Sequence, residues 1–440
     1  MNPTIRKIIF FTFLTLFFIG APLAVLYTAG FRYNFQDGYV VRTGVLSVST
    51  TPRNANIILN GTDISHDTPY IIKHLMPDNY DLTISKDGYK PWQSIVEVKS
   101  AETTTVHNAL LFLDGEPENL LEEDWEVFSE SPDGSKAAYL IYNAGWYELW
   151  LYDVEGREPM MIGRFVGLSS PELLWSAESG YLILDDNAKE PALFAGNGSP
   201  LELDRSLSAG ATSIFWHPSA DRILYISSVN SLSQIDLTTG SITKFENTNV
   251  KTVMIDASII TLADNGSQVE LKQTIGNETN LIALLPRASY SIVLRDGEYL
   301  LLTDNRGKIF LVNIRAEQPL LLEEDASMFD WLEDSDLLVY SNGNEVDVYN
   351  AWTHSTELIT RLGETIEQVK WHPTGTNILL ITSNSLIAIE HKKTADQRVV
   401  TVLIDDVDVE SFWISEDGEF AYVYGIIDEV AGLYELALTR

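Results

Sequence analysis

The apolar residues of the chain form one long stretch near its start, followed by many short runs that end in turn residues. Residues 8–29 contain no charged side chain. From residue 43 onward the apolar runs are short, often alternate with polar positions, and are separated by Gly, Pro, Asn and Asp. Such runs are typical of β-strands. The pattern therefore predicts one N-terminal helix followed by an all-β protein.

The long apolar stretch predicts a transmembrane helix. Its 22 residues would span about 33 Å as a helix, which exceeds a hydrocarbon core of about 30 Å. A buried core helix would show a polar face, and this stretch has none. A cleaved signal peptide has a shorter apolar stretch and a small-residue cleavage site. An uncleaved anchor is therefore the favoured interpretation, and a cleaved signal is the alternative.

The flanking charges predict the orientation of this helix. Arg6 and Lys7 precede the stretch, and the next cation is Arg32. Because cations are enriched on the cytoplasmic side, residues 1–7 are predicted to be a cytoplasmic tail and residues 8–29 a signal anchor. All later residues are predicted to be extracytoplasmic. Aromatic residues that fit an interfacial belt at the outer end are Tyr27, Phe31 and Tyr33.

Residues 43–111 predict a small β-sandwich, since short strands alternate with turns and no stretch has helical periodicity. Asn60-Gly61 between two apolar runs is the strongest hairpin signal. The unit resembles the PEGA domain family. The motifs that carry the resemblance are Pro52 to Ala55, Asn60-Gly61, Asp67-Thr68-Pro69, Pro77 to Tyr80 and Gly88-Tyr89.

The PEGA resemblance has three departures, because Asn54, Asp67 and Asp78 stand where the family has glycine. Asn and Asp are the non-glycine residues that best tolerate a left-handed backbone, so the turns are expected to survive. The resemblance implies an extracytoplasmic module that acts in envelope or surface interactions and has no catalytic residues.

The rest of the chain, residues 117–440, repeats one phrase: an apolar strand that ends in an aromatic residue, a polar turn and two further strands. The clear copies begin at Phe128, Trp175, Trp216, Trp331, Trp371 and Trp413. Neighbouring copies are 41, 40 and 42 residues apart where they are clearest, and the gap of 115 residues after Trp216 leaves room for two degenerate copies, at Met254 and Ile292. This period predicts a β-propeller, with eight blades favoured and seven as the alternative.

The turns of these repeats resemble those of TolB-type and related WD-like propellers. The residues that carry the resemblance are Ser131-Pro132-Asp133-Gly134, Trp216-His217-Pro218 and Trp371-His372-Pro373. The resemblance implies an architecture only, because that architecture serves many functions. The final copy ends after its third strand, so a segment around residues 118–121 is predicted to supply the missing outer strand and remove an exposed edge.

The charge of the chain limits its partners. There are 63 Asp and Glu against 29 Lys and Arg, for a net charge of −34, and the body without Arg6 and Lys7 carries −36. Such a surplus repels phosphate backbones and excludes nucleic-acid binding driven by counterion release. It also argues against docking on anionic lipid headgroups. Without cysteine the chain has no disulfide, thiol nucleophile or thiolate metal site.

Candidate chemistry is sparse. None of the seven histidines has metal-ligand spacing, and His217 and His372 occupy the same turn position in two repeats, which favours a packing role. No nucleophile elbow, Walker A loop or dinucleotide fingerprint occurs. Acidic clusters, which are interpreted as solvated loops rather than calcium sites, are Glu122-Glu123-Asp124, Asp185-Asp186 and Asp406, Asp408 and Glu410. No catalytic, cofactor-binding or metal-binding residue is predicted.

Nine of the ten tryptophans fall into two groups. Those at the equivalent repeat position, Trp175, Trp216, Trp331, Trp371 and Trp413, are predicted to pack between blades. Trp92, Trp125, Trp146 and Trp352 lie outside that register. Among these, Trp92 and Trp146 lie in or beside turns, where packing is the simpler expectation and an exposed indole that stacks on a sugar or apolar partner is the alternative.

Together these observations predict a single-pass membrane protein with a non-catalytic binding or scaffold role in the cell envelope. The membrane is contacted through the helix, and the expected partner is a protein or a cell-wall glycan. The competing class is a propeller enzyme with an acidic or cofactor-dependent central site, which would require several buried titratable groups to converge there. A sensor subunit is a third class, although seven residues before the span leave little room for signalling.

Overall fold

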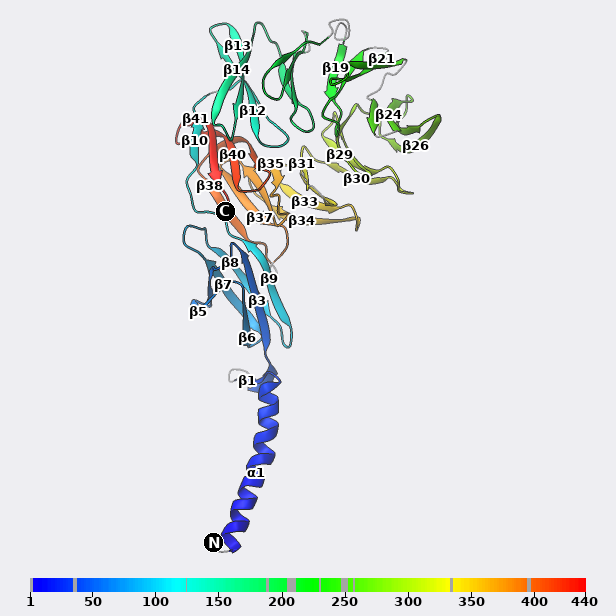
Figure 1. Ribbon diagram of the computed structural model, residues 1–440. Coiled ribbons are helices and arrows are strands. Elements are labelled where there is room, and N and C mark those ends of the chain that lie inside the picture. Colours follow the sequence, from blue (N-terminus) through cyan, green and yellow to red (C-terminus); the bar gives the residue numbers. More distant parts are fainter. Residues whose placement is uncertain are drawn as a thin grey trace.

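The computed structural model describes residues 3–34, 38–123, 125–186, 190–203, 211–228, 231–246, 252–255, 258–332, 335–393 and 397–440. Within these ranges it contains one helix and 41 strands, which confirms the predicted fold class. Figure 1 shows the helix at one end, a small sandwich next to it, and a larger set of sheets arranged around a common centre. Predicted features that lie outside the described residues involve Met1, Asn2, Asp124, Asp256, Glu333 and Asp334.

The helix α1 (Pro3–Thr28) carries the apolar stretch. Its segment Ile5–Thr28 has a mean hydropathy of 2.4 and none of the most apolar window is buried against the rest of the chain. A core helix of a soluble domain would be covered by other elements. By length and composition α1 is therefore a candidate membrane span or signal anchor.

The chain returns to the helix end before the first domain begins. Strand β1 (Phe31–Asn34) pairs with β2 (Tyr39–Arg42) as a small hairpin. After the hairpin, the backbone N–H and the side-chain hydroxyl of Thr43 both donate hydrogen bonds to the Gly30 carbonyl, at 2.9 and 3.0 Å. Gly30 has a φ of +86°, which an L side chain rarely adopts. The first domain therefore begins directly beside the end of α1.

The PEGA-like unit, residues 43–111, is a two-layer β-sandwich, as predicted. One sheet has the order β6-β3-β9 and the other has the order β5-β4-β7-β8. The strands of the unit are β3 (Gly44–Thr51), β4 (Asn56–Leu59), β5 (Thr62–Asp67), β6 (Tyr70–Leu75), β7 (Asp78–Ser85), β8 (Trp92–Val98) and β9 (Thr103–Leu110). Apolar side chains from both sheets, such as Leu46, Ile57 and Leu82, are fully buried between them.

The turns of the unit agree in part with expectation. Asn60 and Gly61 both have positive φ, 48° and 72°, as a type I′ hairpin turn requires. Of the three residues that replace family glycines, Asn54 adopts a left-handed φ of 61°, whereas Asp67 and Asp78 do not. At those two positions the backbone conformation of this chain therefore does not require glycine.

After the sandwich, the described residues form eight four-stranded antiparallel sheets, which we call blades 1 to 8. Blade 1 contains β11 (Val127–Glu130), β12 (Lys136–Asn143), β13 (Trp146–Asp153) and β14 (Glu158–Phe165). Blade 2 contains β15 (Pro171–Trp175), β16 (Tyr181–Asp186), β17 (Ala192–Ala195) and β18 (Pro200–Leu201). Blade 3 contains β19 (Ala211–Trp216), β20 (Ile223–Ser228), β21 (Ser231–Asp236) and β22 (Ser241–Glu246).

The two degenerate copies predicted at Met254 and Ile292 correspond to blades 4 and 5. Blade 4 contains β23 (Thr252–Ile255), β24 (Ser258–Asp264), β25 (Val269–Ile275) and β26 (Glu278–Leu285). Blade 5 contains β27 (Tyr290–Asp296), β28 (Tyr299–Asp304), β29 (Lys308–Asn313) and β30 (Leu320–Asp325). Blade 6 contains β31 (Met328–Trp331), β32 (Leu337–Ser341), β33 (Glu345–Asn350) and β34 (Ser355–Arg361). Blade 7 contains β35 (Ile366–Trp371), β36 (Asn377–Thr382), β37 (Ser385–Glu390) and β38 (Val400–Asp405).

Blade 8 joins the two ends of the repeat segment. Its strands are β39 (Asp408–Ile414), β40 (Phe420–Ile427), β41 (Val430–Ala437) and β10 (Glu118–Leu121). Strand β10 pairs antiparallel with β41 as the outer strand of the sheet, which confirms that residues 118–121 supply the missing strand of the last copy. Arg157 of blade 1 reinforces this pairing, because its guanidinium contacts Glu118 at 3.0 Å and Glu435 at 2.6 Å, one carboxylate from each strand.

The repeat tryptophans pack between blades, as predicted. Trp413 in blade 8 donates its indole N–H to the carbonyl of Gly134 in blade 1 at 3.0 Å. Trp216 of blade 3 donates in the same way to Leu174 of blade 2 at 2.9 Å. Trp371 is 4% exposed and packs with residues of blades 6 and 7. Each indole thus fixes the spacing of two neighbouring sheets.

The sandwich and the propeller share an apolar junction. Trp92 is 2% exposed, and its indole N–H donates to Glu390 of blade 7 at 2.7 Å. Val399, next to β38, is part of the sandwich core. The Leu113 N–H donates to the Leu438 carbonyl at 2.8 Å. The alternative that Trp92 is exposed in a turn is therefore wrong, because the propeller covers it.

Replacing Gly432 with Ala is expected to weaken the closure of blade 8. A Cβ at this position would lie 2.3 Å from the Leu121 carbonyl oxygen, so β10 would have to shift. We expect the free energy of unfolding to fall by about 1–3 kcal/mol, measured by urea titration of the full chain. The control is Gly363→Ala, because nothing lies within 4 Å of a Cβ there. Equal stability of both variants would contradict the role of this close approach.

Candidate functional site

The turns between the first and second strands of the blades lie on one face of the propeller. In three of them a glycine N–H closes the turn onto the carbonyl three residues earlier: Gly134 to Ser131, Gly375 to His372 and Gly418 to Ser415, each at 2.8 Å. All three glycines have φ between 66° and 76°. The Ser-Pro-Asp-Gly motif and the Trp-His-Pro motif at residues 371–373 therefore form the same tight turn. Its polar residues lie around the centre of the propeller.

A cavity of about 670 Å³ opens among these turns. The ends of the inner strands β11, β31, β35 and β39 line it, together with the turn of blade 2. Trp331, Trp371 and Trp413 form part of its wall. Its charged lining residues are Glu130, Asp133, Glu178, Asp330, Glu416 and Lys370. The cavity therefore combines an aromatic wall with five carboxylates and one cation.

A second cavity of about 850 Å³ adjoins the first between blades 8 and 1. The two share Asp133, Gly134, Ser415 and Glu416. The second cavity adds the charged residues Asp153, Glu155, Asp417, Glu435, Lys136 and Arg157. We call the two cavities together the acidic groove. With the shared residues counted once, it is lined by nine carboxylates and three cations.

Asp330 is a partly buried carboxylate of the groove. Its Oδ2 accepts a hydrogen bond from the Trp371 backbone N–H at 2.7 Å, and its Oδ1 lies 3.8 Å from the Lys370 ammonium. Burial raises the pKa of Asp330, and the Lys370 charge opposes this shift. Because its side chain is still 24% exposed, Asp330 can contact a ligand in the cavity.

Asp133 lines the same cavity but serves its own turn. Its Oδ1 accepts hydrogen bonds from the Ser131 hydroxyl at 2.6 Å and from the Ser135 N–H and hydroxyl at 3.0 and 2.9 Å. Although burial acts in the opposite direction, these hydrogen bonds lower the pKa of Asp133. Asp133 is thus held as an anion by its turn.

The two repeat-equivalent histidines are buried turn residues, as predicted. His217 is 5% exposed and His372 is 1% exposed. Nδ1 of His372 accepts the Thr374 N–H at 3.3 Å, and Nε2 lies 3.1 Å from the Gly418 carbonyl of blade 8. This arrangement fits a neutral ring that donates from Nε2 between blades. Burial lowers the pKa of His372, and the hydrogen bond to Gly418 opposes the shift.

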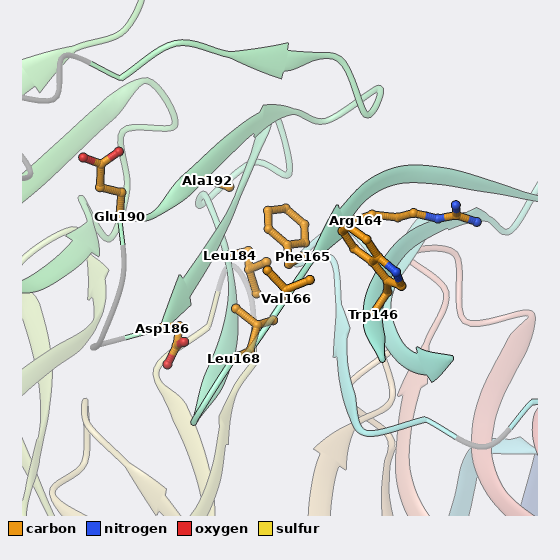
Figure 2. A pocket seen from close by; sticks show the side chains of 9 residues that line it. All are labelled: Trp146, Arg164, Phe165, Val166, Leu168, Leu184, Asp186, Glu190 and Ala192. Carbon is orange, nitrogen blue, oxygen red and sulfur yellow. The ribbon is translucent and has the colours of Figure 1, made fainter. Parts of the chain in front are cut away.

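A smaller pocket of about 250 Å³ lies between blades 1 and 2. It is on the opposite face, because Trp146 begins β13 at the far end of β12. Figure 2 shows Trp146, Arg164 and Phe165 side by side, with Leu184, Val166 and Leu168 behind them and Glu190 on the far side. Arg164 pairs with Glu148 at 2.8 Å. Trp146 is 47% exposed, so its indole is exposed, whereas its stacking on a sugar or apolar partner stays a prediction.

Sequence reasoning missed a second exposed indole. Trp352 is 77% exposed and lies in the turn between β33 and β34. The Asn350 side chain accepts hydrogen bonds from the N–H groups of Trp352 and Thr353, at 3.0 and 2.8 Å. An Asn two residues before the tryptophan is the signal for this turn. Of the other two indoles outside the repeat register, Trp92 and Trp125, both are buried.

The described residues of the acidic clusters interact with neighbouring strands and turns. Within the described ranges, no group of three or more His, Asp or Glu side chains is arranged to hold a metal ion. Asp185 faces Glu172 across two strands, and burial together with the neighbouring Glu172 and Asp186 carboxylates raises its pKa. Asp186 instead accepts the N–H groups of Ser169 and Ser170 at 3.1 and 3.2 Å. Asp124 of the first cluster lies outside the described residues.

Comparisons with known proteins match one segment of the chain to a protein family and a larger part of it to solved structures. The PEGA domain family model matches residues 43–111. No curated protein matches the chain in sequence. Among solved structures, Sqt1 from Saccharomyces cerevisiae is 11% identical, with a TM-score of 0.47, over 74% of this chain and 98% of that chain. Sqt1 from Chaetomium thermophilum is 11% identical, with a TM-score of 0.48, over 74% and 100%. The Neurospora crassa Pan2 WD40 domain is 11% identical, with a TM-score of 0.37, over 61% and 90%.

Replacing His372 with Gln is expected to change how stability depends on pH. The lowered pKa of His372 means that the unfolded chain binds the proton first. The wild type should therefore lose stability as the pH falls below about 6.5, by up to about 1.4 kcal/mol per pH unit. In H372Q this contribution is absent, so the difference in unfolding free energy between the two proteins should shrink from pH 7.5 to 5.

The measurement is urea unfolding of the full chain across that pH range. The control is His107→Gln, which makes the same substitution at an exposed histidine. A constant difference between wild type and H372Q at every pH would contradict a neutral buried ring.

Proposed function

We propose that this protein is a membrane-anchored, extracytoplasmic and non-catalytic binding protein whose acidic groove holds a cationic segment of a protein partner. The observation that carries this proposal is the groove itself, in which nine carboxylates and three cations surround connected cavities on one face of the propeller. A cell-wall glycan is the other candidate partner, and the exposed Trp146 beside Phe165 would be its contact.

The composition of the groove fits a Lys- or Arg-rich segment. Two of the three cations are already paired, since Arg157 contacts Glu118 and Glu435 and Lys370 faces Asp330. Glu178 and Glu416 are exposed. They lie in the turns of blades 2 and 8, the two blades next to blade 1. Opposite charges across an interface speed association and select partners. Trp331, which is the partly exposed tryptophan of the cavity wall, supports cation–π and apolar contacts.

The distribution of charge along the chain supports a platform held away from the membrane. Residues 30–111 contain seven cations and eight acids, whereas residues 112–440 contain 20 cations and 55 acids. The net charges are therefore −1 and −35. Nearly all of the acidity belongs to the propeller, and the nearly neutral PEGA-like unit separates it from α1 (Figure 1). Electrostatic repulsion from anionic lipids is screened over about 8–10 Å.

The groove should bind a cationic probe in a salt-sensitive manner. For the full chain in detergent and fluorescent octalysine, we expect the triple variant Glu130→Gln, Glu178→Gln and Glu416→Gln to bind about ten-fold more weakly. Three exposed charge pairs at about 0.2–1 kcal/mol each give this magnitude. The control carries the same charge change on exposed acids elsewhere: Glu278→Gln, Glu317→Gln and Glu364→Gln.

Equal weakening in both triple variants would mean that only the net charge matters, and the groove would not be the site. Salt-insensitive binding to wall glycan that is lost in Trp146→Ala would favour the glycan instead.

The absence of cysteine allows a direct test of orientation. We expect Thr353→Cys, in the exposed turn of blade 6, to react with a membrane-impermeant maleimide in intact cells. Asn2→Cys should react only after the cells are permeabilised. The wild type is the control, since it has no thiol. The reverse pattern would contradict the orientation, and a mature chain that lacks the introduced residue 2 would show that the helix is a cleaved signal.

A further inference from the structure

A pocket of about 210 Å³ lies where α1 meets the PEGA-like unit. Thr28 and Gly30 at the helix exit line it. Arg42 comes from the hairpin strand β2, and Lys73 and Glu102 come from two different parts of the PEGA-like unit. It is far from the acidic groove along the molecule, because the sandwich lies between α1 and the propeller (Figure 1).

The position of this pocket follows from the length of the helix. The 24 residues of Ile5–Thr28 would extend about 36 Å, somewhat more than a hydrocarbon core of about 30 Å. If α1 spans the membrane, Thr28 therefore lies at the level of the lipid headgroups. The neighbouring hairpin of β1 and β2 exposes Tyr39 and Val40, each 55% exposed, and aromatic side chains favour this interfacial layer.

Arg42 lies beside the helix exit, because it pairs with Phe31 in the β1–β2 hairpin. Gly30, at the turn that leaves α1, lies so close that a Cβ there would be 3.9 Å from Cγ of Arg42. Lys73 lies in β6 opposite Val45 of β3. The two cations therefore reach one pocket from strands on either side of the entry to the sandwich.

Neither cation forms an ion pair within the part of the chain that the structure describes. Among the ion pairs of the described residues, none involves Arg42 or Lys73. By contrast, Arg32 is engaged at the helix end, where it donates to the Tyr27 and Phe31 carbonyls at 2.7 and 2.9 Å. Glu102 also lines the pocket, which leaves a local charge of about +1. The chain has more than two acids per cation. Two cations without an ion-pair partner at the helix exit can therefore bind an anion from outside the chain.

We propose that Arg42 and Lys73 bind the phosphate of a phospholipid headgroup in the outer leaflet. The guanidinium can bind two phosphate oxygens at once, and the ammonium supplies a second charge-assisted contact. This inference rests on the proposed anchoring of α1 in the membrane. It also refines the argument from net charge against lipid contact, because that charge belongs to the propeller and residues 30–111 carry only −1.

The experiment measures phospholipid retained by the full chain after purification in lipid-free detergent, by phosphorus analysis and native mass spectrometry. The wild type should retain about one phospholipid per chain, and Arg42→Gln with Lys73→Gln should retain at least ten-fold less. The control is Arg53→Gln with Lys86→Gln, which removes the same charge near the other end of the sandwich. That end adjoins the propeller, since the Asp114 N–H, at the start of the following segment, donates a hydrogen bond to the Gly88 carbonyl. The control should retain lipid like the wild type.

Three results would overturn the proposal or its basis. Equal retention by both double variants, with equal thermal stability, would overturn the pocket. Binding of inorganic phosphate as tight as that of short-chain phosphatidylglycerol would assign the pocket to free anions instead of lipid. If the wild type itself fails to sediment with membranes, the proposed membrane anchor is wrong, and with it the proposed function. If the R42Q/K73Q variant sediments with membranes and still retains lipid, only the inference about this pocket is contradicted.

Discussion

A series of stacked sheets has a first and a last member, and each would leave an unpaired strand edge. In this protein the hydrogen bonds between β10 and β41 join the start and the end of the series within blade 8. The Arg157 guanidinium, which contacts one carboxylate on each of these strands, adds blade 1 to the same joint. The acidic groove lies beside this joint, so its shape depends on a pairing between residues more than 300 positions apart.

The same joint couples the propeller to the sandwich. Between β9 and β10 the chain passes through Phe112, which packs with the core of blades 7 and 8 and lies edge-on to His372. The Trp92 indole, buried at the other side of the junction, donates to blade 7. The two parts therefore share apolar core and hydrogen bonds, and the PEGA-like unit is a fixed base of the propeller.

The local sequence pattern predicted the strands and turns of this fold well. The apolar runs, the turn residues and the period of about 40 residues can each be recognised from residues that are close together in the sequence. The closing strand was predictable for the same reason, since the last copy lacks one strand. The burial of Trp92 was not, because its partner Glu390 is 298 residues away. The acidic groove was likewise hidden, since its residues converge from five blades, and the exposure of Trp352 depends on how blade 6 faces solvent.

The helix exit has a mechanical consequence. Thr43 is hydrogen-bonded to Gly30 through both its N–H and its hydroxyl, so little slack separates α1 from the sandwich. With the sandwich fixed to the propeller as well, the sandwich and propeller together form a lever whose short arm is the helix. If α1 spans a bilayer, a sideways force on the groove would reach that bilayer as a torque that tilts α1, whereas a flexible linker would absorb it.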